Sequence, residues 1–187
     1  MASTKRESQR CGSLFLLVRE EKEADLMFTL RPMTGIYLLC GDRILMLHRH
    51  GSKVVDGLWV ASAGGHFEEN EMKHPAACVL RELREELNLA LEQLHGLAMR
   101  YVTLRRVGEE IRQNYYFFAE LAEEVPLTSN EGELRWVPLN EVMALEMPFS
   151  ARLMMEHYLT TGRFTTALYA GVTDDHMMHF AEMKEKR

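Results

Sequence analysis

Cysteine is scarce and scattered in this sequence. The 187 residues include only Cys11, Cys40 and Cys78, whose spacing is not that of a metal-ligand set. Cys78 lies between Ala77 and Val79, where a thiol usually packs as a small apolar side chain. These features predict a reduced, cytoplasmic setting.

Long apolar runs are lacking too. The run at residues 14–18 is too short for the core of a signal peptide, and the charged residues 19–21 end it. We therefore expect no transmembrane span and no membrane partner.

Positive charge is in deficit, because the formal net charge is −6 at pH 7. A chain of this charge does not attract a nucleic-acid polymer or an anionic membrane through bulk electrostatics. A phosphorylated small molecule would need local cations, meaning a metal ion and a few Arg or Lys side chains. The apolar content of 47% fits one globular domain with a full core.

Residues 64–88 contain most of the candidate functional residues of the chain. They form a glycine turn and an acidic loop, followed by a predicted helix. Pro75 suits the first helical turn, where its missing N–H would have been unpaired anyway. Asn88 tolerates the left-handed conformation expected at the helix end. A buried stripe is expected at helical spacing, formed by Leu80, Leu83 and Leu87.

Three carboxylates share one side of this helix. Glu82, Glu85 and Glu86 stand at i, i+3 and i+4, with about 5–6 Å between their Cβ atoms. Most acidic helix faces are simply solvated. Here Arg81 precedes the cluster and can reach Glu71, and a double glycine turn lies upstream. Carboxylates crowded in this way favour a hard divalent cation such as Mg²⁺, which completes its shell with water and phosphate oxygens.

The stretch resembles the Nudix box, G-x5-E-x7-R-E-U-x-E-E-x-G-U, in which U is aliphatic. Gly65 to Glu71 has the family spacing, and residues 81–89 supply the rest of the motif. The sequence departs from it twice, because nine residues separate Glu71 from Arg81 and Asn88 replaces the usual glycine. The insertion precedes the helix, where a longer loop costs little. It puts the position of Glu71 in question but leaves the helical carboxylates unaffected.

The resemblance implies an α/β fold, a Nudix-type α/β/α sandwich with a mixed β-sheet, over residues 33–187. Residues 1–32 then form an N-terminal extension, partly disordered, with a possible hairpin between residues 14–18 and 26–30. Further expected strands and helices follow from periodicity and turn signals. Strands are expected at 36–40, 43–47, 97–104, 114–121, 164–170 and 176–183, with a charged turn at 105–112. A second helix is expected from its cap at Ser150 through Thr161, ended by Gly162.

The resemblance also implies metal-dependent hydrolysis of a nucleoside diphosphate linked to another group, X. Mg²⁺ or Mn²⁺ would be the cofactor, and the implied metal ligands are Glu82, Glu85, Glu86 and Glu71. The implied catalytic residues are Glu85, Arg81 and Glu131. The implied substrate-binding residues are Gly64, Gly65, His66 and Arg49.

Several of these assignments have competing interpretations. Arg49 fits a basic surface loop as well as a phosphate contact. Three histidines, His48, His50 and His66, raise the idea of zinc, but their spacing lacks a Cys pair or an H-E-x-x-H helix. Glu131 matches the extra loop carboxylate of many Nudix enzymes, Glu133 is the second choice, and both also fit a solvated loop.

The identity of X is the least determined feature. The short loops resemble those of oxidised-nucleotide sanitisers that act on 8-oxo-dGTP, which makes a nucleoside triphosphate the first candidate. The base-reading asparagine of several such enzymes is replaced here by Met147-Pro148-Phe149-Ser150. Cleavage of ADP-ribose or of a nucleotide sugar is the alternative activity. A third hypothesis is a Nudix-fold sensor that binds a nucleotide without cleaving it. The expected partner is a small nucleotide, and a homodimer is left open.

Overall fold

The computed structural model describes residues 28–51, 55–174 and 176–184. The expected first strand of the N-terminal hairpin, at residues 14–18, lies outside these ranges. Within them, no helix is long and apolar enough to cross a membrane.

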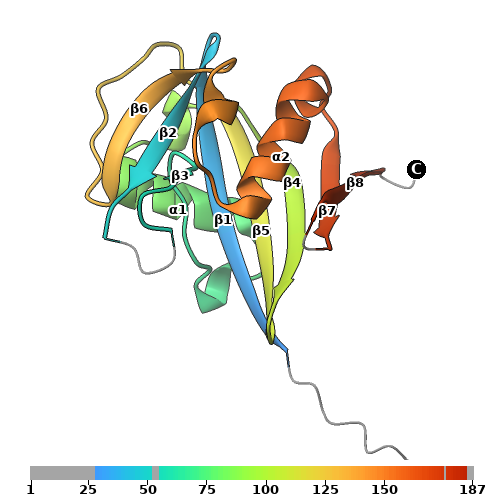
Figure 1. Cartoon of the computed structure of the whole chain (residues 1–187). Coiled ribbons are helices and arrows are strands. Elements are labelled where there is room, and N and C mark those ends of the chain that lie inside the picture. Colours follow the sequence, from blue (N-terminus) through green and yellow to red (C-terminus); the bar gives the residue numbers. More distant parts are fainter. Residues whose placement is uncertain (1–27, 52–54, 175, 185–187) are drawn as a thin grey trace, which may run out of the picture.

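One mixed sheet organises the described part of the chain, in the order β3-β2-β1-β5-β4-β7-β8, with β6 also pairing with β2 (Figure 1). Its strands β1 to β8 span Thr29–Cys40, Arg43–Arg49, Trp59–Val60, His95–Val107, Glu110–Glu120, Gly132–Pro138, Leu168–Thr173 and Met178–Met183. The β1–β5 and β4–β7 pairs are parallel, and the other pairs are antiparallel.

Helices cover both faces of the sheet, because apolar side chains alternate along its central strands. The face that carries Tyr37 and Phe118 packs against α2 (Phe149–Thr160). The opposite face, with Ile36 and Leu38, packs against α1 (Pro75–Leu87). Figure 1 shows α1 behind the sheet and α2 in front of it. The expected α/β/α sandwich is confirmed. Short 3₁₀ helices η1 to η4 span Glu69–Glu71, Leu91–Gln93, Val142–Ala144 and Gly162–Phe164.

The helix that carries the carboxylates forms as the sequence predicts. It begins at Pro75 and ends at Leu87, and Asn88 follows in the left-handed conformation with φ 53° and ψ 33°. Its buried stripe is shifted slightly, because Val79 is fully buried and Leu80 is only partly covered. The inserted residues lie in the turn between η1 and α1.

The expected charged turn at residues 105–112 is wrong. Only Gly108 and Glu109 form the turn, with Gly108 at φ 61°. The flanking charged residues continue β4 and β5, which are therefore longer than predicted. Charge alone suggested a loop, but side chains of an extended two-stranded arm can stay half-exposed without ending the strands.

Two smaller corrections concern helix α2 and strand β7. Ser150 does not cap α2, because the N-cap residue is Pro148 and Ser150 lies inside the first turn, buried. Strand β7 begins at Leu168, four residues later than expected, because η4 occupies Gly162–Phe164. Gly162 follows the C-cap as predicted, and a Cβ there would collide with the Tyr101 hydroxyl.

The first strand begins at Thr29, so it crosses the predicted domain boundary at residue 33. Thr29 pairs with Glu110, and the pairing continues without a break to Leu39 opposite Glu120. Residues 29–32 are thus part of the central sheet.

Candidate active site

Arg81 is the centre of the carboxylate cluster. Its guanidinium donates from Nε to Glu71 at 2.8 Å and from Nη1 to Glu82 and Glu85 at 2.8 and 3.0 Å. Nη2 donates to the other oxygen of Glu71 and to the backbone oxygen of His66, both at 3.0 Å. These acceptors raise the pKa of Arg81 above its ordinary value, with Glu71 the largest cause. One cation therefore fixes the relative positions of three carboxylates.

The insertion leaves Glu71 in reach of Arg81, which confirms the predicted ion pair. The Glu71 side chain is only 8% exposed, and one oxygen also accepts the backbone N–H of Glu68 at 2.9 Å. Hydrogen bonds from Arg81 are the main reason why the pKa of Glu71 falls to about 2. Both oxygens of this carboxylate are therefore already engaged within the protein.

The glycine turn allows the close packing of backbone and carboxylates. A Cβ at Gly65 would overlap an oxygen of Glu82, and one at Gly64 would overlap the carbonyl oxygen of Thr34. The Gly64 N–H donates to Glu86 at 3.1 Å. Gly64 is therefore required by space, since a side chain there would displace the backbone of β1, whereas a side chain at Gly65 would displace the carboxylate of Glu82.

Glu82 and Glu85 differ in their surroundings. The Glu82 side chain is 12% exposed, and burial is the main reason why its pKa is raised. Glu85 is 58% exposed and lines a groove beside α1 together with Ala77, Leu80, Arg81 and Arg84. Glu85 is therefore open to ligands from solvent.

Glu86 and Glu131 form a carboxylate pair across the site. Burial and the charge of Glu131 raise the pKa of Glu86 to about 8. Arg49 holds Glu131 at 2.8 Å, while the buried Oε2 of Glu131 has no hydrogen-bond donor among the described residues. Two ionised carboxylates here repel each other, so the pair needs a shared proton or a cation.

The two substrate-binding side chains predicted from the sequence have different contacts. Arg49 is 26% exposed and engaged with Glu131. His66 is exposed, and its Nε2 accepts a hydrogen bond from the Nε of Arg31 at 2.8 Å. Burial first, and then the charge of Arg31, lower the pKa of His66. The neutral ring is thus held against a guanidinium.

The remaining histidines and Glu133 have other contacts. The His48 ring stacks on Trp59 with 4.7 Å between centroids and touches His50 edge-on. Glu133 pairs with Arg135 at 3.0 Å and is 56% exposed. Glu131, the first choice from the sequence, is the loop acid that meets the box helix.

The donor set suits a hard divalent cation. Across residues 28–51, 55–174 and 176–184, no group of three or more His, Cys, Asp or Glu side chains stands ready-made around one point. The unpartnered oxygen of Glu131 and the raised pKa values of Glu82 and Glu86 nevertheless mark a site short of positive charge. Carboxylate oxygens are the ligands that Mg²⁺ and Mn²⁺ accept, so the residues present fit the ion.

Sequence reasoning missed Arg31, Arg105 and Arg112. The first was assigned to the extension and the other two to a turn. Arg31 lies between the apolar residues Leu30 and Pro32, but the polar neighbours of the other two arginines gave no strand signal.

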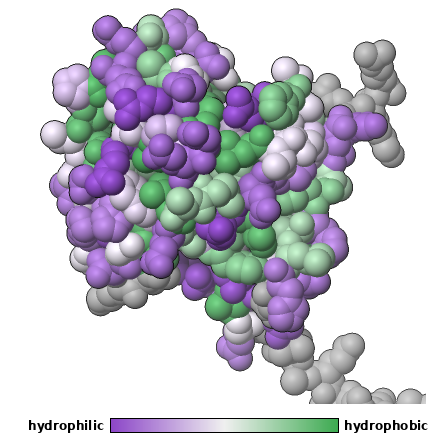
Figure 2. Space-filling view, turned by 45° about the horizontal axis from the view of Figure 1, so that its top comes forward, coloured by the Kyte–Doolittle hydropathy of each residue, from purple (hydrophilic) through white to green (hydrophobic). Residues whose placement is uncertain are grey.

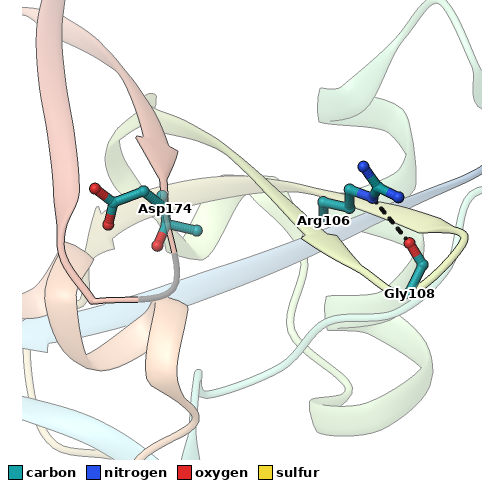
Figure 3. A pocket seen from close by; sticks show the side chains of 4 residues that line it. Arg106, Gly108 and Asp174 are labelled. Atoms are coloured by element: carbon teal, nitrogen blue, oxygen red, sulfur yellow. Dashed lines mark hydrogen bonds between the residues drawn. The ribbon is translucent and has the colours of Figure 1, made fainter.

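A second hollow lies at the ends of β4 and β7, lined by Arg106, Gly108, Thr173 and Asp174 (Figure 3). None of the box residues lines it. Arg106 donates to the Gly108 oxygen at 3.0 Å, and Asp174 accepts the N–H groups of His176 and Met177 at 3.2 and 3.1 Å. The hydrogen bonds of its charged groups are therefore local to the two turns.

A family model described as NUDIX domain matches residues 29–158. The structure is similar to that of a MutT protein from Bacillus halodurans, with a TM-score of 0.58 and 22% identity over 83% of this chain and 99% of the other. It is also similar to E. coli dihydroneopterin triphosphate pyrophosphohydrolase, with a TM-score of 0.55 and 22% identity over 72% and 98% of the two chains. It is similar as well to a C. elegans Ap4A hydrolase, with a TM-score of 0.59 and 15% identity over 72% of this chain and 99% of the other. At these identities the solved structures establish the fold.

Proposed function

This chain belongs to the Nudix family and is a hydrolase of pyrophosphate bonds in nucleotide derivatives. We propose that it cleaves a nucleoside diphosphate linked to X in a metal-dependent reaction. The proposed product is a nucleoside monophosphate.

One observation carries this proposal: the box glutamates converge on Arg81 while the carboxylate of Glu86 faces that of Glu131. A helix face that only met solvent would not bury Glu82 or press two carboxylates together. The arrangement gains stability when a divalent cation binds.

We assign metal binding to Glu82, Glu85 and Glu86. A bound Mg²⁺ or Mn²⁺ supplies charge neutralisation for the phosphates and activation of water. Glu71 was predicted as a fourth ligand, and because both its oxygens are engaged, we propose that it acts by orienting Arg81. Arg81 in turn keeps Glu82 and Glu85 in place for the ion.

Proton transfer falls to the same set of carboxylates. Glu85 is exposed enough to meet the attacking water, and we propose that it orients or deprotonates it. Glu131, fixed by Arg49, is the second candidate for this role. We propose that the Gly64–Gly65 backbone and His66 contact the substrate, because the Gly64 N–H donates to Glu86 and the His66 backbone oxygen accepts from Arg81.

For X, a nucleoside triphosphate of the 8-oxo-dGTP type is our first substrate candidate, as the resemblance of the short loops implies. Two proteins of similar structure, a dihydroneopterin triphosphate pyrophosphohydrolase and an Ap4A hydrolase, are named for different substrates. ADP-ribose and nucleotide sugars complete the set to be tested. The expected setting is cytoplasmic, with a small nucleotide as partner and a homodimer as an open prediction.

The test is a nucleotide panel incubated with Mg²⁺ and scored for phosphate, pyrophosphate and nucleoside monophosphate. The proposal predicts a monophosphate from at least one class, with pyrophosphate or X-phosphate as the second product. Tight nucleotide binding without hydrolysis of any member would overturn it in favour of a nucleotide sensor.

A further inference from the structure

Three arginines stand in one row across the central strands of the sheet. Arg31 on β1 is directly opposite Arg112 on β5, which is directly opposite Arg105 on β4. Directly paired residues point to the same face of a sheet. With about 4.8 Å between neighbouring strands, the row covers roughly 10 Å.

The row carries an excess of positive charge in a protein that is acidic overall. Like charges placed directly opposite each other destabilise a sheet. Glu110 partly compensates, since it lies 2.6 Å from Arg112 and 3.6 Å from Arg31. Three guanidinium groups against this one carboxylate leave two positive charges. The Arg31 and Arg112 side chains are only 32% and 33% exposed, so they are not a freely solvated face.

Arg105, at the far end of the row, lacks a carboxylate partner among the described residues. Its guanidinium lies 4.5 Å above the Phe149 ring, and its buried Nε has no hydrogen-bond partner there. Phe149 is the first residue of α2, whose N-terminus has no side-chain cap. The positive end of this 12-residue helix adds to the preference for an anion at this place.

The near end of the row reaches the active site. Arg31 donates to His66, whose backbone oxygen accepts from Arg81. Met33, two residues after Arg31, pairs with His66 across the sheet edge. The arginine row therefore begins beside the box at Arg31 and runs across the sheet to Arg105, which lies over the first residue of α2.

We propose that the arginine row is a second anion subsite, which binds a phosphate group of the substrate remote from the anhydride that is cleaved. The inference rests on the proposed function. It favours nucleotides that carry a ribose phosphate in addition to the 5′ pyrophosphate linkage over the triphosphates, ADP-ribose and nucleotide sugars named above, so a nucleotide of this kind joins the panel. Arg105 supplies specificity for the remote phosphate, and Phe149 is the adjoining apolar surface.

The experiment measures calorimetric binding of three probes to the full chain in the presence of Mg²⁺. The probes are AMP, adenosine 3′,5′-bisphosphate and adenosine 2′,5′-bisphosphate, which contain no anhydride to be hydrolysed. The variants are Arg105→Gln, Arg105→Lys and, as the matched control, Arg106→Gln. Arg106 is the next residue on β4, points to the other face and contacts Phe28 and Gly108. Thermal melting checks that each variant is folded.

We expect at least one bisphosphate to bind the wild type about tenfold or more tightly than AMP, the gain of one charge-assisted contact. Arg105→Gln should remove most of that ratio, Arg105→Lys should keep part of it, and Arg106→Gln should keep all of it. Which bisphosphate binds more tightly identifies the ribose position.

Equal binding of AMP and both bisphosphates to the wild type would overturn the subsite, as would a ratio unchanged by Arg105→Gln. Either result leaves the proposed hydrolase intact, because pyrophosphate cleavage is scored separately on the nucleotide panel. Conversely, if the protein hydrolysed no nucleotide but still showed the Arg105-dependent binding ratio, the proposed hydrolysis would be contradicted and the anion subsite would stand.

Discussion

Arg81 and its partners show how single residues organise this site. The box helix places Glu82 and Glu85 within reach of one guanidinium, and the loop before it supplies Glu71. Sequence spacing could predict that Arg81 meets Glu71, because Glu71 lies in the segment just before the helix that carries Arg81. It could not predict that Arg31 would meet His66, since 35 positions separate them and their contact depends on the sheet.

Glu71 should make the stability of the protein depend on pH. Its folded-state pKa of about 2 lies below its ordinary value near 4.5. A depressed carboxyl pKa contributes stability that is complete above the unfolded pKa and is lost as pH falls through the folded pKa. We expect the free energy of unfolding of the wild type to exceed that of Glu71→Gln at pH 5, and the gap to shrink toward pH 2. Urea denaturation across this range measures it. A gap independent of pH would contradict the assignment.

Glu85→Gln should abolish most turnover and leave the fold intact. Glutamine keeps the size and helix propensity of glutamate. The lost pair with Arg81 is half-exposed, so we expect the stability to change by no more than about 1 kcal/mol. Loss of the carboxylate that positions metal or water typically lowers the rate about 10²–10⁴-fold. Steady-state kinetics at saturating Mg²⁺ provides the measurement.

The control for Glu85 is Glu69→Gln, because Glu69 is an exposed acid of η1. We expect its rate to change by less than about tenfold, or roughly 1.4 kcal/mol. Wild-type turnover in Glu85→Gln would show that another carboxylate has the role.

At the scale of elements, the sequence predicted the helix ends and turns that have strong local signals. It did not predict the strand pairings, which depend on contacts between distant residues. Pro75 and Asn88 bound helix α1 as expected, and the β1–β2 hairpin turns at Gly41. Strand β5, by contrast, lies between β1 and β4, and its parallel pairing with β1 has no local signal. The charged arm of β4 and β5 was missed because its polar residues satisfy both loop and strand patterns.

The end of α1 offers a clean test of local backbone conformation. Asn88 is exposed and stands at φ 53°, where a side chain with a Cβ is disfavoured. We expect Asn88→Ala to lower the free energy of unfolding by about 1–2 kcal/mol, while Asn88→Gly should match or exceed the wild type. Thermal and urea denaturation measure both. Equal stability of the alanine and glycine variants would show that the helix end relaxes.

For the whole molecule, the hydropathy of the surface differs from one side to the other. Hydrophilic side chains predominate toward the β2 and β6 side of the surface in Figure 2, and hydrophobic ones gather toward α2 and the β7–β8 hairpin. Exposed apolar residues there include Phe164, Val172 and Met183. The hairpin lies beyond the residues matched by the family model.

The start of the domain can be located by truncation. Because β1 begins at Thr29 and Arg106 stacks on Phe28, we expect a protein starting at residue 28 to keep both its melting temperature and its hydrolysis. A protein starting at Met33 loses four residues of β1 and should melt at a lower temperature. Equal melting temperatures for the two would place the boundary at residue 33 after all.

The most direct test of the central claim is the product formed by the wild type with and without a divalent cation. The account predicts that Mg²⁺ or Mn²⁺ restores hydrolysis to a chelated protein, that the product is a nucleoside monophosphate, and that Glu82→Gln and Glu86→Gln prevent the restoration. Hydrolysis that continues undiminished after exhaustive chelation, or that is unchanged in both variants, would contradict it.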